Sequence, residues 1–217
     1  MNIKAFILDL DGVITDTAEY HYLAWKKLAD EEDITFNRKE NEKLRGVSRR
    51  KSLEILLNGR EVSEKRIKEM MDRKNVYYNK YIDNISKDDL LPGAEDLISS
   101  IISNDCKVAL ASASKNARKV INKLEIDKHF NFIADGYSVN KAKPAPDIFL
   151  YTAQNINTEP KNCVVIEDAK AGINAAISAG MLAVGIGPEN SLGHAHLRYD
   201  KVKDVNIKDI FNFDSNI

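Results

Sequence analysis

Two pairs of carboxylates follow short apolar runs in this sequence. Asp9 and Asp11 end the first apolar run of the chain, and Glu167 and Asp168 end a later one. Alternate side chains of an extended backbone point to the same side, so Asp9 and Asp11 can face one site together. Taken alone, the first pair is typical of a strand that ends in an Asp-Gly turn. The second pair is typical of acids that stabilise the first turn of a helix.

Two further stretches contain potential hydrogen-bond donors to a phosphate. One follows the apolar run 108–111, and the other precedes a pair of prolines. Ser112-Ala113-Ser114-Lys115-Asn116 opens a helical pattern, and the backbone N–H groups of such a helix start also suit a phosphate. Lys143 stands before Pro144-Ala145-Pro146. By themselves, these stretches are equally typical of an ordinary helix N-terminus and a solvated loop.

The combination of these groups indicates one kind of chemistry. Four carboxylates gathered at neighbouring strand ends repel one another unless a cation joins them. Oxygen ligands without His or Cys suit Mg²⁺, which also takes a phosphate oxygen as a ligand. Lys143 and the hydroxyls of Ser112 and Ser114 would supply positive potential and donors to that phosphate. The sequence therefore predicts phosphoryl transfer.

The elements that must position these groups alternate between strand and helix. Apolar runs predict strands at 5–8, 108–111, 164–166 and 182–186, with a weaker candidate at 132–134. Helical patterns lie at 94–102, 117–124, 147–154 and 171–179. This alternation predicts an α/β fold whose core is a doubly wound (Rossmann-like) parallel sheet. Ligands of such sheets bind at the carboxyl ends of the strands, where the polar groups lie.

One long block breaks the alternation and predicts an inserted α-helical cap. Residues 16–91 show helical periodicity without a strand pattern, and Ser48 and Ser63 are candidate helix N-caps. We expect residues 1–15 and 92–217 to form the α/β phosphotransferase core and residues 16–91 the cap. Lys74 falls on the apolar stripe of the cap, where it either snorkels to water or faces a site.

Composition excludes several partner classes. The 217 residues include 32 basic and 33 acidic side chains, so the chain offers no electrostatic footprint for nucleic acid or a membrane. We expect Cys106 and Cys163, which fit no metal or redox spacing, to be reduced core residues. The first apolar run meets Asp9 too early for a signal peptide. We expect a cytoplasmic protein that is a monomer.

The residues described above resemble, in this order, the motifs of the haloacid dehalogenase superfamily of phosphotransferases. The four motifs correspond to Asp9-Leu10-Asp11-Gly12, Ser112, Lys143 and Glu167-Asp168. Within the superfamily the sequence is most similar to the members that interconvert β-glucose 1-phosphate and glucose 6-phosphate. The stretches that carry this similarity are DLDGVITDTAEYH, LRGVSRRKSL, ASASKN, KPAPDIF and IED.

The resemblance implies roles for the core residues. Asp9 would be the nucleophile that becomes a phospho-aspartate, and Asp11 the general acid and base. Mg²⁺ would be held by Asp9, Asp168 and the backbone carbonyl of Asp11, with Glu167 in support. Ser112 and Lys143 would bind the transferring phosphoryl group.

The resemblance also implies roles for cap residues. In Gly46-Val47-Ser48-Arg49, the arginine would hold the non-reacting phosphate of a sugar phosphate. Ser114, Lys115 and Asn116 would meet the same substrate from the core. Thr17, His21 and Lys74 would couple cap closure to the position of Asp11.

The implied activity is conversion of β-D-glucose 1-phosphate to D-glucose 6-phosphate and back, by way of glucose 1,6-bisphosphate. A Mg-dependent sugar-phosphate phosphatase with the same core is the nearest alternative. A catalytically silent sugar-phosphate-binding protein is a third, although intact Asp9, Asp11, Lys143 and Asp168 argue against it.

Overall fold

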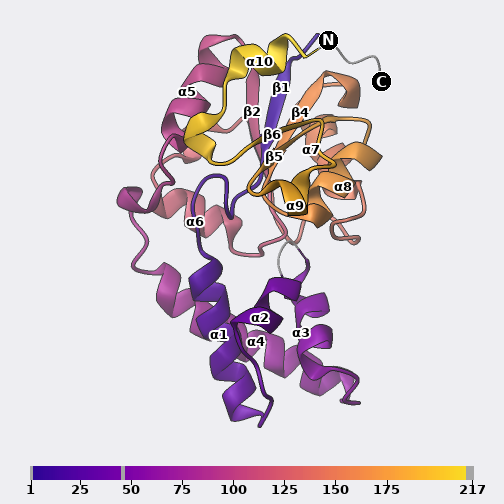
Figure 1. Ribbon diagram of the computed structural model, residues 1–217. Coiled ribbons are helices and arrows are strands. Elements are labelled where there is room, and N and C mark those ends of the chain that lie inside the picture. Colours follow the sequence, from indigo (N-terminus) through magenta and orange to yellow (C-terminus); the bar gives the residue numbers. More distant parts are fainter. Residues whose placement is uncertain (1, 45–46, 214–217) are drawn as a thin grey trace.

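The structure is a computed structural model that describes residues 2–44 and 47–213 (Figure 1). Its centre is a six-stranded parallel sheet with strand order β3-β2-β1-β4-β5-β6. The strands are β1 (Ala5–Leu8), β2 (Lys107–Ala111), β3 (Phe132–Ala134), β4 (Cys163–Glu167), β5 (Leu182–Ile186) and β6 (Leu197–Tyr199). This is the strand order of the doubly wound Rossmann fold, whose direction of winding reverses next to β1. The predicted fold class is confirmed.

Helices cover both faces of the sheet. The core helices are α5 (Ala94–Ser103), α6 (Ala117–Lys123), α7 (Asp147–Asn155), α8 (Lys170–Ser178), α9 (Glu189–Leu192) and α10 (Ile207–Phe211). Phe6 and Leu8 of β1 pack with buried residues of α5, α6 and α10, whereas Ala5 and Ile7 pack with α7 and α8. A strand buried on both faces needs a continuous apolar run, which explains why the sequence pattern located the central strands.

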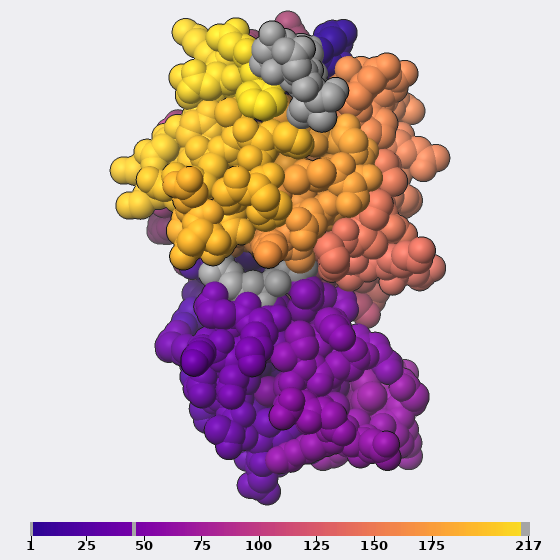
Figure 2. Space-filling model, turned by 45° about the vertical axis from the view of Figure 1, so that its right-hand side comes forward, coloured from indigo at the N-terminus to yellow at the C-terminus, as the bar shows by residue number. Residues whose placement is uncertain are grey.

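The helices between β1 and α5 form a separate group, which we call the cap helices. They are α1 (Ala18–Glu31), α2 (Arg38–Asn41), α3 (Arg49–Leu57) and α4 (Glu64–Ile82). Their apolar faces enclose a cluster of their own, which includes Trp25, Leu28, Leu53 and Met70. The cap helices lie below the carboxyl ends of the strands, with a narrower waist between the two parts (Figures 1 and 2).

The cap helices begin and end as local sequence chemistry dictates. The hydroxyl of Ser48 accepts a hydrogen bond from the Lys51 N–H at the start of α3, and Ser63 accepts one from the Arg66 N–H at the start of α4. Such N-caps satisfy backbone donors that the first helical turn leaves free. Both predicted N-caps are confirmed.

Two chain segments connect the cap helices to the core, and they run side by side. Thr15 and Leu90 form an isolated antiparallel bridge, and the Leu91 N–H donates to the carbonyl of Ile14 over 2.9 Å. The Thr15 hydroxyl adds a 2.7 Å hydrogen bond to the carbonyl of Asp89. A paired linker of this kind restrains how the cap helices can turn relative to the sheet.

Short 3₁₀ turns and two buried cysteines complete the fold. The turns are η1 (Glu42–Leu44), η2 (Lys87–Asp89), η3 (Asp127–His129), η4 (Pro160–Asn162) and η5 (Val202–Asp204). Cys106 and Cys163 are buried free thiols, as the sequence predicted. Within the described residues, no helix combines the length and apolarity needed to cross a membrane.

Candidate active site

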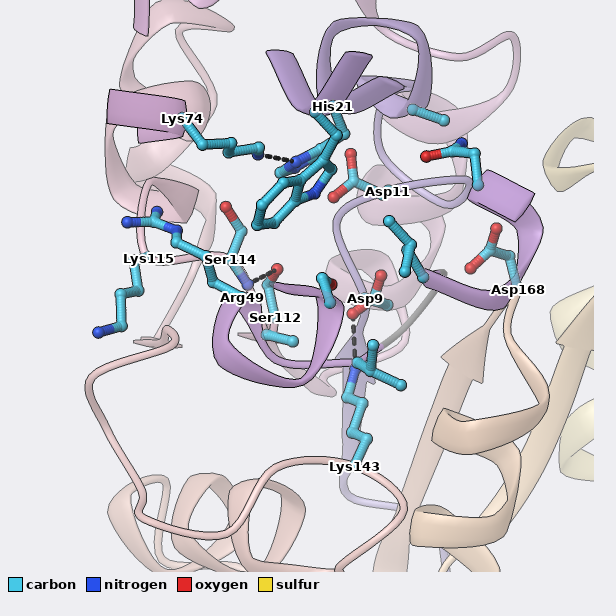
Figure 3. A pocket seen from close by; sticks show the side chains of 17 residues that line it. Asp9, Asp11, His21, Arg49, Lys74, Ser112, Ser114, Lys115, Lys143 and Asp168 are labelled. Carbon is cyan, nitrogen blue, oxygen red and sulfur yellow. Dashed lines mark hydrogen bonds and ion pairs between the residues drawn. The ribbon is translucent and has the colours of Figure 1, made fainter. Parts of the chain in front are cut away.

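A cavity lies between the carboxyl ends of the central strands and the cap helices (Figure 3). Most of the residues singled out from the sequence line it. They are Asp9, Asp11, His21, Val47, Arg49, Lys74, Ser112, Ser114, Lys115, Lys143 and Asp168. Residues separated by more than 150 positions in the chain therefore meet at the edge of the sheet where ligands of this fold class bind.

Four predicted residues lie beside the cavity rather than in its wall. Thr17 and Glu167 form hydrogen bonds to wall residues, as described below. Ser48 caps α3, and the side-chain amide of Asn116 donates to Asn75 of α4 over 2.9 Å. Asn116 thus joins the core to the cap helices. Gly46, a further predicted substrate-binding residue, lies outside the described residues.

Lys143 is a buried cation beside Asp9. Its Nζ donates to Asp9 Oδ1 (2.6 Å), to Glu167 Oε2 (2.8 Å) and to the carbonyl of Ala111 (2.9 Å). Burial alone would lower the pKa of Lys143, but the carboxylates of Asp9 and Glu167 raise it above the ordinary value. A buried charge persists when it is paired and fully hydrogen-bonded. Lys143 therefore presents a fixed positive charge beside Asp9.

Three carboxylates converge next to this lysine. Oxygen atoms of Asp9, Glu167 and Asp168 lie within 4.8 Å of one another. Burial raises the pKa of Glu167, and the neighbouring Asp9 raises it further. One lysine cannot neutralise three acids, and an all-oxygen donor set suits a hard divalent cation. The group fits the divalent metal site that the sequence predicted.

Two glycines allow these acids to approach. Gly12 has φ +77°, and a Cβ there would lie 2.2 Å from Asp168 Oδ2. A Cβ on Gly172, in the first turn of α8, would lie 2.0 Å from the carboxyl carbon of Glu167. A side chain at either position would displace one of the acids, so the glycines are part of the site.

Asp11 points into the cavity from the loop after β1 (Figure 3). Its Oδ1 accepts hydrogen bonds from the backbone N–H of Thr17, over 3.2 Å, and from the Thr17 hydroxyl. Burial raises the pKa of Asp11 to about 6. A carboxyl group with a pKa near neutrality can both give and take a proton, which is what a general acid and base must do.

A chain of contacts leads from Asp11 into the cap helices. The Thr17 hydroxyl also lies 2.9 Å from the phenol oxygen of Tyr78, whose ring stacks on His21 with centroids 4.1 Å apart. Nδ1 of His21 is 2.7 Å from Lys74 Nζ. Thr17, His21 and Lys74 therefore belong to one contact network. Tyr78 is its centre, although no pattern in the sequence indicates a role for it in the site.

Arg49 and Lys115 are cations of the cavity without a carboxylate partner among the described residues. Arg49 enters from the start of α3, where burial lowers its pKa below the ordinary value. Lys115 rests with its Nζ 4.6 Å from the ring centroid of Tyr137. Ser112 is almost fully buried, and its Oγ accepts from the Ser114 N–H over 3.1 Å. The cavity thus has Lys143 beside Asp9 and, separately, Arg49 on its cap side and Lys115 on its core side.

Comparisons with known proteins agree with this geometry. The family model of the haloacid dehalogenase-like hydrolases matches residues 3–180. A β-phosphoglucomutase of Bacillus subtilis is 45% identical over 212 residues, which cover 95% of this chain and 93% of that protein. A phosphatase of phosphorylated carbohydrates from Thermotoga maritima is 28% identical and covers 97% of both chains.

A solved structure is similar over nearly the whole chain. The crystal structure of β-phosphoglucomutase from Clostridium difficile superimposes with a TM-score of 0.94 and 46% sequence identity, covering 97% of this chain and 96% of that one. The sequence match, the strand order and the set of residues at the strand ends lead to one conclusion. The chain belongs to the haloacid dehalogenase-like hydrolase family.

Proposed function

We propose that this enzyme interconverts β-D-glucose 1-phosphate and D-glucose 6-phosphate through D-glucose 1,6-bisphosphate. The observation that carries the proposal is the presence of two separate cationic positions in one cavity. Lys143 is bonded to Asp9, whereas Arg49 stands on the cap side without a carboxylate partner among the described residues. A substrate with phosphates at both ends fits such a cavity, while a plain phosphatase needs only the first position.

In this proposal Asp9 is the nucleophile. Its carboxylate oxygen attacks the phosphorus of the bisphosphate, the bond from phosphorus to the sugar oxygen breaks, and Asp11 gives that oxygen a proton. In the other half-reaction Asp11 takes the proton from the C6 hydroxyl of β-glucose 1-phosphate, and the oxygen of that hydroxyl attacks the phosphorus of phospho-Asp9. The bond from phosphorus to the Asp9 carboxylate breaks, which regenerates Asp9 and forms the bisphosphate. Lys143, 2.6 Å from Asp9 Oδ1, and Ser112 bind the phosphoryl oxygens. Fixed charges of this kind stabilise the transferring group.

The metal of the proposal is Mg²⁺. The carboxylates of Asp9 and Asp168 and the backbone carbonyl of Asp11 would hold it, with Glu167 in support. The converging oxygens of the three acids support this assignment. When bound, the cation would supply neutralisation of the phosphoryl charge.

The remaining residues bind or position the sugar phosphate. Arg49 would hold the distal phosphate, and Val47 and Ser114 would contact the sugar phosphate from opposite sides of the cavity. Thr17 holds Asp11 by two hydrogen bonds and would keep it aimed at the sugar oxygen. We further propose that residues 16–91 act as a cap that closes over the cavity and keeps water from phospho-Asp9.

A product assay tests this function. The enzyme is incubated with Mg²⁺, β-glucose 1-phosphate and a trace of glucose 1,6-bisphosphate, with Asp9→Asn as the control. Formation of glucose 6-phosphate that disappears in the control is the expected result. Release of inorganic phosphate without glucose 6-phosphate would indicate the phosphatase, and an unchanged substrate would indicate a binding protein. A monomeric state and a cytoplasmic location stay predictions, which gel filtration and cell fractionation test.

A further inference from the structure

Lys74 is buried in the cap side of the cavity wall, and none of the acids that the structure describes pairs with it. The residue is 1% exposed and lies on the inward face of α4. Among the described residues, no carboxylate lies within ion-pair distance of its Nζ, whose hydrogen-bonding partner is Nδ1 of His21 at 2.7 Å (Figure 3). A buried ammonium ion is costly unless other groups stabilise it.

Two aromatic faces occupy the place that a carboxylate would take. Lys74 Nζ lies 4.6 Å from the ring centroid of Tyr78 and 5.0 Å from that of Trp25. His21 and Trp25 are four residues apart on α1, and Lys74 and Tyr78 are four apart on α4, so each pair shares one face of its helix. Trp25 is 3% exposed and Tyr78 is fully buried. Both rings are therefore desolvated and within the range of a cation–π interaction.

We propose that Trp25 and Tyr78 are positioning residues that form an aromatic cage and hold Lys74 as an ammonium ion at the cavity. A carboxylate in this place would also stabilise the ammonium ion, but it would cancel the charge and repel a phosphate. The quadrupole of an aromatic ring stabilises the cation while leaving its net charge in place. The cage therefore suits a lysine that must remain attractive to an anionic substrate.

Some of the charged groups around Lys74 lower its pKa, and others raise it. Burial and the nearby Arg49 lower the pKa of Lys74 well below its ordinary value, whereas Asp11 raises it. Burial, Lys74 and Arg49 likewise lower the pKa of His21, so its Nδ1 is free to accept a hydrogen bond from the ammonium. Burial raises the pKa of the Tyr78 phenol, which keeps it neutral. The aromatic cage offsets part of the decrease in the pKa of Lys74 that burial causes.

The chain contains a single tryptophan, which makes the cage measurable. Because that tryptophan is Trp25, its fluorescence should change with pH as Lys74 loses its proton. The transition is identified by its absence in Lys74→Met. Because this variant keeps all the tyrosines, its pH profile also serves as the background that is subtracted. Tyr78→Leu removes a ring face, whereas Tyr78→Phe keeps the face and loses only the hydroxyl.

The expected result is a lower pKa for Lys74 in Tyr78→Leu, by about one unit, and an unchanged pKa in Tyr78→Phe. The other ring is tested with Trp25→Leu. Because this variant lacks the fluorophore, the pKa of Lys74 is measured from the carbon-13 NMR signal of its Cε and should decrease by a similar amount. This second measurement also decides the matter if Tyr78→Leu does not fold. Equal values in Tyr78→Leu and Tyr78→Phe, or in Trp25→Leu and the wild type, would overturn the cage.

The identity of the anion rests on the proposed function and is tested separately. The affinity for β-glucose 1-phosphate should fall as pH rises through the pKa of Lys74, and this midpoint should move down with it in Tyr78→Leu. Absence of sugar-phosphate binding in the wild type would contradict the proposed function while the titration of Lys74 still decides the cage. If the pKa of Lys74 shifts in Tyr78→Leu while the pH midpoint of β-glucose 1-phosphate binding stays fixed, the charge of Lys74 has no role in binding the substrate.

Discussion

At the scale of single residues, Asp9 and Asp11 share a loop but have different surroundings. Asp9 is paired with Lys143 and lies within the acid group, whereas Asp11 is held by Thr17. We predict that Asp9→Asn abolishes formation of the phospho-enzyme and weakens Mg²⁺ binding. Asp11→Asn should bind Mg²⁺ nearly as the wild type does, because its backbone carbonyl remains.

Turnover of Asp11→Asn should nevertheless fall by at least about 100-fold, since positioned acid–base groups are worth about 10²–10⁴ in rate. Calorimetry measures the metal affinity, and the product assay measures turnover. Near-normal turnover in Asp11→Asn would contradict the acid–base role. Lost Mg²⁺ binding in the same variant would mean that the side chain is the ligand.

Arg49 offers a second residue-scale test, with a matched control beside it. Removing the cation that faces a bound phosphate costs about 2–5 kcal/mol, so Arg49→Ala should lower kcat/KM for β-glucose 1-phosphate by at least about 30-fold. Arg50 is the next residue of α3, where it pairs with Glu54 and Glu64 at the surface. Arg50→Ala should change turnover little.

Acetyl phosphate tests the reacting position alone, because its phosphate is the group that transfers to Asp9 and it carries no distal phosphate. We expect Arg49→Ala to hydrolyse acetyl phosphate at close to the wild-type rate. An equal loss of both activities in this variant would mean that Arg49 serves the reacting phosphoryl group or the fold instead.

The cavity was largely predictable from residue types at the ends of apolar runs, because parallel strands bring those ends to one edge. Tyr78 was not predictable in this way. In the sequence it is one more member of the buried stripe of α4, and its hydroxyl meets Thr17, 61 positions earlier in the chain, only after folding. Lys74 stood out because a charged residue interrupts that stripe.

At the scale of elements, α8 and the acid at the end of β4 are fitted to each other through Gly172. A methyl group at Gly172 would collide with the Glu167 carboxyl group. We predict that Gly172→Ala shifts Glu167 and weakens Mg²⁺ binding by about 10–100-fold, as is typical for residues that support metal ligands.

Asn174→Ala, a substitution at a half-buried position of the same helix that adds no atoms, is the control and should bind Mg²⁺ normally. Calorimetry and thermal unfolding, measured on both variants, separate metal affinity from stability. If Gly172→Ala binds Mg²⁺ as tightly as Asn174→Ala does, the close approach of α8 has no role in the metal site.

The strands show which elements a sequence pattern can locate. The limits of β1, β3 and β5 agree with the apolar runs, since these runs are bounded by polar residues or turns. β6 was missed, because Leu197–Tyr199 is short, half-buried and interrupted by an arginine. Its strand character comes from pairing with β5, which no local pattern shows.

At the scale of the whole molecule, the proposed chemistry depends on keeping water from phospho-Asp9 while a sugar hydroxyl reaches it. The cap helices lie over the cavity, are joined to the core by paired linkers, and are tied to α6 through Asn116 and Asn75. The network from Asp11 through Thr17 to Tyr78 crosses from the core to the cap helices. We therefore expect closure of the cap helices over the cavity and alignment of Asp11 to occur together.

The most direct test of the account follows one phosphoryl group. The enzyme is labelled with glucose 1,6-bisphosphate carrying ³²P, the label is located on Asp9, and the labelled enzyme is then mixed with Mg²⁺ and either β-glucose 1-phosphate or buffer. We expect rapid transfer of the label to the sugar, as glucose 1,6-bisphosphate, and far slower release as inorganic phosphate in buffer. Release of inorganic phosphate at the same rate with and without the sugar phosphate would contradict it.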